Sequence, residues 1–148
     1  MDRDTICNDE DSDTDGDGCL NKAEQQVTIG SEQTGGRRDA TYFWDFYDVW
    51  THPIGNPSGW ERNKLIDLFG DIFGVAARFG AERVTPPTKP EALTEALTSP
   101  PDETGYHADF DRSPQVGPNL WDLGPPDGTI DLFNDIFGAA YQFGHDCT

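Results

Sequence analysis

The chain has few basic residues and no long apolar run. Its 148 residues include ten Lys or Arg against 28 Asp or Glu, which gives a formal net charge of −18. Without a basic stripe, we do not expect nucleic-acid binding, because the phosphates would repel the protein. No stretch reaches the roughly eighteen consecutive apolar residues of a membrane span. The first residues, MDRDTICNDEDSD, also lack the apolar core of a signal peptide.

Apolar residues are scarce as well. They make up 34% of the chain, while 16 Gly and 11 Pro favour loops. Typical globular domains have about 45–50% apolar residues when Gly is included. A small core of this kind needs support from a metal, a disulfide or an assembly partner. We therefore expect a small, mainly α and loop-rich fold.

The acidic residues are concentrated at the start of the chain, where eight acids and one base lie between Asp2 and Asp17. A disordered acidic tail is one interpretation; in a folded site, such a cluster requires a cation. Cys7 and Cys19 bracket the run closely enough to form a disulfide, which leaves Cys147 free or paired with a neighbouring chain. A disulfide indicates an oxidising compartment. We expect an extracellular or cell-surface location, with this chain a mature segment or fragment.

The spacing within the run matches a twelve-residue EF-hand calcium loop from Asp13 to Glu24. Calcium takes six to eight oxygen ligands, and such a loop curls around the ion to supply them. The expected ligands are Asp13, Asp15 and Asp17 at positions 1, 3 and 5, the Cys19 carbonyl at position 7 and Glu24 at position 12. Gly18 permits the sharp turn at position 6, and Leu20 at position 8 is expected to pack inward. The segment NKAEQQV then predicts a short helix.

An internal repeat organises the rest of the chain. Residues 65–80 and 129–144 are identical at eleven of sixteen positions at an offset of 64. We divide the chain into an acidic loop and helix (1–29), a first loop–helix repeat with an aromatic cluster (41–80), a Pro/Thr-rich linker (84–102) and a second repeat (103–148). The segment EALTEALT predicts one or two helical turns inside the linker.

Each repeat predicts a helix of about three turns. In the first copy Ile66, Phe69, Ile72, Phe73, Ala76 and Phe79 recur at three- and four-residue steps, which predicts one core-facing stripe. Gly80 and Gly144 are expected to end the helices in the left-handed conformation. Gly74 and Gly138 inside the helices suggest that the two copies pack closely around a local two-fold axis.

The repeats also contain weaker versions of the calcium loop. Asp127-Gly128-Thr129-Ile130-Asp131 is similar to loop positions 5 to 9, and Asn63 to Asp67 occupies that place in the first copy. Asp71 and Asp135 are the candidates near position 12, although Asn134 can also serve there. Asp48 and Asp111 are the candidate upstream ligands. The alternative is that these carboxylates cap the helices. With the first loop, the sequence predicts two to three calcium ions, with repeat ligands Asp48, Asn63, Asp67, Asp71, Asp111, Asp127, Thr129, Asp131 and Asp135.

These motifs support a resemblance to known families. The doubled loop–helix arrangement resembles a divergent dockerin, and DSDTDGDGCLNKAE is similar to the calcium repeats of thrombospondin type 3 and related bacterial cell-surface proteins. GGRRDATYFWDFYDVW together with PPDGTIDLFNDIFGAAYQFGHDC resembles C-terminal regions of large secreted bacterial proteins. The resemblance implies two pseudo-symmetric calcium-loop–helix units plus an N-terminal EF-hand-like loop.

No other chemistry is indicated as strongly. His145, Asp146 and Cys147 do not complete a tetrahedral zinc site, and no catalytic motif is recognisable. The aromatic run from Tyr42 to Trp50 suggests core packing, or alternatively a surface for carbohydrate or another subunit. We expect a non-enzymatic structural or adaptor module with a protein partner, or alternatively a subunit that self-assembles into an extracellular fibre.

Overall fold

A computed structural model describes residues 12–26, 38–52, 59–102, 105–118 and 122–147. These parts of the chain are mainly helix and loop, as predicted, and contain isolated β-bridges but no strand. None of their helices is long and apolar enough to cross a membrane. The short helix expected after the acidic loop is confirmed as α1 (Asn21–Gln26).

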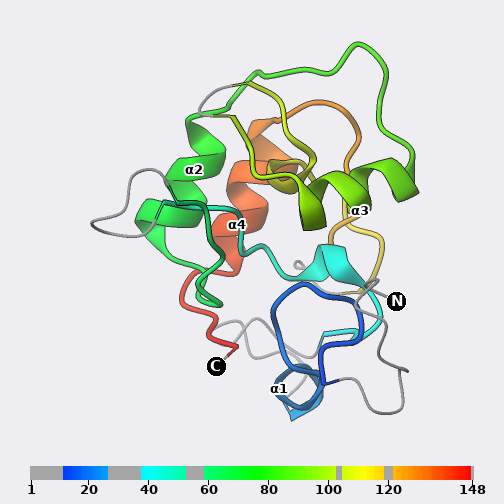
Figure 1. Cartoon of the computed structure of the whole chain (residues 1–148), viewed down its shortest axis with the longest axis vertical. Coiled ribbons are helices and arrows are strands. Elements are labelled where there is room, and N and C mark those ends of the chain that lie inside the picture. The colour runs from blue at the N-terminus through cyan, green and yellow to red at the C-terminus, as the bar shows by residue number, and fades with distance from the viewer. Residues whose placement is uncertain (1–11, 27–37, 53–58, 103–104, 119–121, 148) are drawn as a thin grey trace.

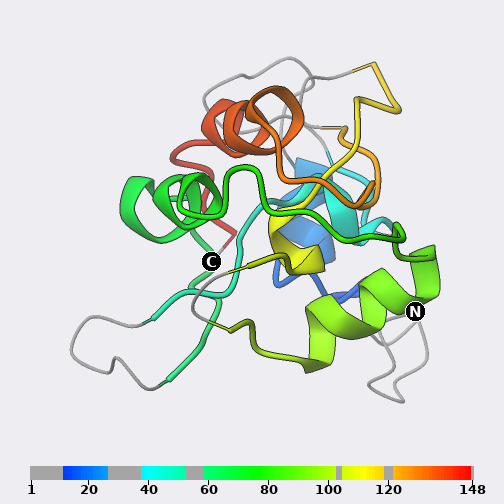
Figure 2. The same ribbon diagram turned by 90° about the horizontal axis from the view of Figure 1, so that it is seen from above.

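The two repeats form similar helices that lie side by side in both views (Figures 1 and 2). Each begins with a π-helical turn, η3 (Leu68–Ile72) or η5 (Leu132–Ile136), and continues as α2 (Phe73–Ala76) or α4 (Phe137–Tyr141). These helices are shorter than the three turns predicted. Gly80 and Gly144 have φ of 80° and 82°. Their predicted left-handed conformation is therefore confirmed.

The end of each repeat pairs with the beginning of the other. Ile66 N donates to His145 O at 2.9 Å, and Ile130 N donates to Ala81 O at 3.0 Å. Gly144 N donates to Ile66 O at 2.8 Å, and Gly80 N donates to Ile130 O at 2.9 Å. Because the four bonds form two matched pairs, the repeats cross-link each other through their ends.

The predicted apolar stripe faces the core only in part. Ile66 is fully buried and Ile72 packs against the core, but the phenylalanines do not face it. Phe69, Phe73 and Phe79 are 79%, 52% and 62% exposed, whereas Asp71 and Val75 are fully buried. A π-helical turn contains more residues than an α-helical turn, so positions predicted from an α-helical period rotate away from the core. The inward face of each helix carries an aspartate, Asp71 or Asp135, instead of phenylalanine.

The helix glycines lie against segments other than the neighbouring repeat helix. A Cβ on Gly74 would lie 3.5 Å from Phe110 Cε1, and a Cβ on Gly138 would lie 2.6 Å from Leu123 Cδ1. These neighbours come from the segments that precede the repeat helices. Gly138 therefore makes room for Leu123, and the explanation by helix–helix approach is wrong.

Part of the segment interpreted as a linker is packed structure. Helix α3 (Lys89–Thr98) begins at a capping box, in which Thr88 N donates to Glu91 Oε2 at 2.9 Å. Its buried Ala92 and Ala96 pack against Phe43 and Trp44 of the short 3₁₀ turn η2 (Phe43–Asp45). The helix is longer than the one or two turns predicted, and it covers the aromatic run.

The disulfide joins different cysteines from those predicted. Cys19 is bonded to Cys147, 128 residues away in the sequence, and both are fully buried. The predicted Cys7–Cys19 bond is therefore wrong, because Cys19 is already paired; Cys7 itself lies outside the described residues. The bond attaches the acidic loop to the end of the second repeat.

Candidate metal centre

The acidic loop curls around its first carboxylate. Asp13 accepts hydrogen bonds from Gly16 N at 3.0 Å and from Gly18 N at 3.2 Å. Both glycines have positive φ, 80° and 99°, a conformation that costs glycine little. This arrangement brings one carboxylate oxygen each from Asp13, Asp15 and Asp17 within 4.8 Å of one another. The structure therefore gathers the residues predicted at positions 1, 3 and 5.

Position 12 also points into the loop, whereas position 8 does not. Glu24 is fully buried, and neither of its carboxylate oxygens has a hydrogen-bond partner. Leu20 is 36% exposed, so the prediction that it packs inward is wrong. Cys19 N donates to Asp17 Oδ1 at 2.6 Å, which fixes one side of that carboxylate. The other oxygen of Asp17 and Oδ2 of Asp15 are buried without a partner.

Asp45 is a member of the site that sequence analysis did not identify. It lies in the η2 turn, is 1% exposed and accepts from Asp39 N at 2.7 Å through Oδ2. Its Oδ1 has no hydrogen-bond partner. Asp17, Glu24 and Asp45 each bring an oxygen within 4.8 Å of the others. The only sequence signal was an acidic residue inside an aromatic run, and nothing local connects it to the loop.

Burial, and after it the neighbouring acids, raise the pKa values of the clustered carboxylates. Burial, together with neighbouring acids, raises the pKa of Asp15 to about 7 and that of Glu24 to about 8. Burial also raises the pKa of Asp45 to about 7 and that of Asp17 well above its usual range. Charged carboxylates in such a place require a compensating cation. The all-oxygen cluster can hold a hard metal ion.

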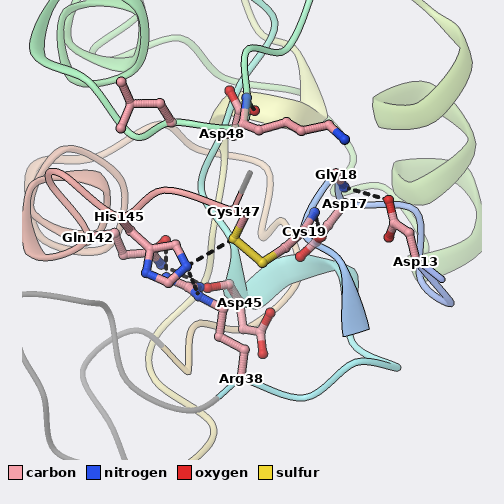
Figure 3. The surroundings of a disulfide bond; sticks show 12 residues. Asp13, Asp17, Gly18, Cys19, Arg38, Asp45, Asp48, Gln142, His145 and Cys147 are labelled. Atoms are coloured by element: carbon pink, nitrogen blue, oxygen red, sulfur yellow. Dashed lines mark hydrogen bonds between the residues drawn. A yellow bond between two sulfur atoms is a disulfide. The ribbon is translucent and has the colours of Figure 1, made fainter. Parts of the chain in front are cut away.

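Arg38 lies beside the cluster and connects it to the second repeat (Figure 3). The guanidinium is buried; its Nε donates to His145 Nε2 at 3.2 Å and its Nη2 to Gln142 Oε1 at 3.1 Å. His145 Nε2 in turn lies 3.0 Å from Cys147 Sγ. Cys19, His145 and Cys147 bring potential metal ligands together, but both sulfurs belong to the disulfide, so neither is available as a thiolate.

The same hydrogen bond recurs in all three acidic loops. Asp13 accepts from Gly18 N, Asp48 accepts from Lys64 N at 2.6 Å, and Asp111 accepts from Gly128 N at 2.7 Å. The three donors all have positive φ, including Lys64 at 65°. Asp48 and Asp111, which were predicted as upstream ligands, thus make the same bond as loop position 1. Their role as calcium ligands stays a prediction.

The later carboxylates of the repeats accept backbone N–H groups. Asp71 accepts from Val49 N at 2.9 Å and from Asp67 N at 2.7 Å. Asp135 has the matching donors Arg112 N and Asp131 N, and also accepts from Tyr47 OH at 3.1 Å. Burial raises the pKa of Asp71 and Asp135 to about 8, while these N–H bonds act in the opposite direction.

The remaining predicted repeat ligands bond to nearby backbone. Asp67 and Asp131 cap the π-helical turns by accepting from Phe69 N and Phe133 N, each at 2.7 Å. Side-chain oxygens accept further local N–H bonds, with Leu65 N donating to Asn63 and Thr129 N donating to Asp127. Within the described ranges, the mutually close metal-ligating groups include none of the aspartates predicted as repeat ligands. Calcium in the repeats stays a prediction.

The aromatic run is divided between the core and an open groove. Phe43, Trp44, Phe46 and Tyr47 are buried, which agrees with core packing. Trp50 instead lines a groove of about 670 Å³ together with His52, Trp60 and Arg78, among others. Carbohydrate binding, the other use suggested for the aromatic run, stays a prediction.

The chain matches no protein-family profile, no curated protein sequence and no solved structure.

Proposed function

We propose that this chain is a non-enzymatic, calcium-binding structural or adaptor module of an extracellular or cell-surface protein. The observation that carries the proposal is the set of unpartnered, buried oxygens on Asp15, Asp17 and Glu24 in a loop with EF-hand spacing. An all-oxygen set of this size favours calcium. Zinc prefers nitrogen and sulfur ligands, and magnesium usually retains several waters.

Of the predicted two to three ions, a second one is supported best in the first repeat. There Asp48 accepts from the position-6 N–H, and its Oδ1 is buried without a hydrogen-bond partner. The buried Cys19–Cys147 disulfide supports the proposed oxidising compartment. As an adaptor, the module binds a protein partner at the cell surface.

The test is calcium titration calorimetry on chelator-stripped protein, with thermal melts followed by circular dichroism. We expect at least one site, in the acidic loop, and a marked loss of stability on chelation. An ion bound only by the folded state adds about 4 kcal/mol when free calcium is about a thousand times the dissociation constant. That is a large fraction of the stability of a small domain.

Asp17→Asn tests the site in the same titration, because it removes one charge from the cluster and hardly changes the volume of the side chain. It should weaken binding and reduce the gain in melting temperature that calcium gives. Magnesium at equal concentration should produce a smaller gain. A chelated protein that melts like the calcium-loaded one would contradict the proposal.

A second candidate function is self-assembly, which the exposed phenylalanines favour. Phe69 and Phe73 form an edge-to-face pair at 5.7 Å, and Phe133 and Phe137 form the matching pair at 6.0 Å. These exposed apolar side chains can pack against other copies of the chain, and contacts that do not close on themselves generate an open assembly. Light scattering with calcium present distinguishes the candidates: a monodisperse monomer rejects self-assembly, whereas growth that Phe69→Ser abolishes supports it.

A further inference from the structure

We infer that Asp45, from outside the twelve-residue loop, is a direct ligand of the bound ion, so that calcium fastens residues 12–26 onto segment 38–50. This inference rests on the proposed calcium binding and adds to it a ligand that the EF-hand pattern does not contain. Asp17, Glu24 and Asp45 are at most 2% exposed, and each has a carboxylate oxygen within 4.8 Å of the other two. Each of the three side chains also has a buried oxygen without a hydrogen-bond partner.

The separation of these oxygens suits one ion. Calcium–oxygen distances are about 2.3–2.6 Å, so two ligands on opposite sides of the ion are separated by about 5 Å. Asp17, Glu24 and Asp45 satisfy that limit pairwise. Asp45 is also held in place, because Oδ2 accepts from Asp39 N while the Asp45 carbonyl accepts from Gln142 Nε2 at 3.0 Å. Oδ1 is left to contact an ion.

Arg38 does not take the place of the ion. Two of its three guanidinium nitrogens donate to His145 and Gln142, and Nη1 has no hydrogen-bond partner. The unpartnered oxygens of Asp17, Glu24 and Asp45 therefore have no bond from this guanidinium. A single arginine also carries too little charge for Asp15, Asp17, Glu24 and Asp45 together. Arg38 reduces the repulsion, while the cluster needs a further cation to be neutralised.

A ligand in this position turns the ion into a structural junction. Segment 38–50 contacts both repeats, since Val49 N donates to Asp71 and Tyr47 OH donates to Asp135. The loop itself is tied to the second repeat by the Cys19–Cys147 bond. An ion held by Asp17, Glu24 and Asp45 thus joins the acidic loop to segment 38–50, which is hydrogen-bonded to both repeats. Loss of calcium should loosen the loop from that segment.

The experiment compares three variants of the full chain with terbium as a luminescent calcium probe. Asp45→Ala should lower the affinities for calcium and terbium by about 10–100-fold or more, the cost usually seen even for groups one shell further out. The luminescence lifetimes in H₂O and D₂O should report about one more bound water, because water replaces the lost oxygen. Glu82→Gln, which alters an exposed carboxylate outside the cluster, should change affinity less than about fivefold and leave the water count unchanged.

Asp17→Asn separates this inference from the proposal on which it rests. If the wild type binds neither ion, both the proposed function and the role of Asp45 are overturned. If the wild type binds and Asp17→Asn weakens binding, but Asp45→Ala keeps the wild-type affinity and water count, only the role of Asp45 is overturned. If Asp45→Ala does not fold, Asp45→Asn replaces it and should still weaken binding about tenfold or more relative to Glu82→Gln.

Discussion

The acidic loop and the second repeat begin in the same way and then diverge. In both, the position-1 aspartate accepts from a backbone N–H with positive φ, Gly18 or Gly128. In the loop, the later carboxylates face one another, and both oxygens of Glu24 have no hydrogen-bond partner. In the repeat, Asp135 accepts from Tyr47 OH and from two backbone N–H groups.

This difference shows what a buried carboxylate requires. Hydrogen-bond donors aimed at a charged carboxylate stabilise it without a metal. Carboxylates that face one another repel, and burial without a partner costs several kcal/mol per charge. We therefore expect the second repeat to hold together without calcium, and the acidic loop to depend on it.

The largest expected effect is the loss of Asp135. Asp135→Ala leaves the N–H groups of Arg112 and Asp131 without their acceptor, while the Tyr47 hydroxyl keeps Phe110 O as its acceptor. Each buried donor left unpaired costs about 1–3 kcal/mol, so we expect a loss of about 3 kcal/mol or more. Urea denaturation measures this loss with and without calcium, with Glu82→Gln, an exposed carboxylate, as control.

The comparison predicts that Asp135→Ala lowers the free energy of unfolding by the same amount with and without calcium. A loss confined to the calcium-loaded protein would make Asp135 a metal ligand. The second repeat would then be a calcium site like the acidic loop, and the two regions would not differ in their need for a metal ion.

A smaller effect is expected from the disulfide. Replacing both Cys19 and Cys147 by Ser should lower stability by about 2–4 kcal/mol, as for other disulfides that close long loops. It should also weaken calcium binding, because the bond holds loop position 7 against the second repeat. Denaturation and calorimetry measure the two effects. Cys7→Ser is the control and should change neither; an equal loss from Cys7→Ser would show that Cys7 is the partner of Cys19.

The parts of this molecule that sequence reasoning found are those with a local signature. The predicted loop ligands lie within one continuous segment, from Asp13 to Glu24. The repeat was recognised because the same residues recur at a constant separation in the sequence. Asp48 and Asp111 were predicted as upstream ligands because each precedes its turn at a comparable point, and each accepts from a backbone N–H of that turn. In the acidic loop, the residues that contact one another in space are also close in the sequence.

The parts that were missed depend on distant contacts or on helix geometry. Cys19 is 128 residues from Cys147 in the sequence, and Asp45 reaches the loop only through the fold. The α-helical period predicted that the phenylalanines face the core, whereas η3 and η5 are π-helical. The wider turn places Asp71 inward and Phe69 outward. No periodicity in the sequence signals that a helix begins with such a turn.

The smallest effects are expected at the position-6 turn, where the two repeats differ. Lys64 has φ of 65°, a conformation that costs a non-glycine residue roughly 1–2 kcal/mol. Lys64→Gly removes that strain but makes the unfolded chain more flexible, so we expect a gain of about 0.5 kcal/mol. Gly128→Ala should instead lose about 1–2 kcal/mol, because a Cβ there is strained and would lie 3.1 Å from Pro86 Cα.

Both variants keep the backbone N–H that donates to the position-1 aspartate, so the sign of the change tests the turn alone. Urea denaturation at fixed calcium measures the two values, and Lys64→Ala controls for loss of the lysine charge. If Lys64→Gly and Lys64→Ala give the same stability, the left-handed turn contributes no strain in the first repeat. The three acidic loops would then share a hydrogen bond without sharing the backbone requirement that makes glycine the favoured donor.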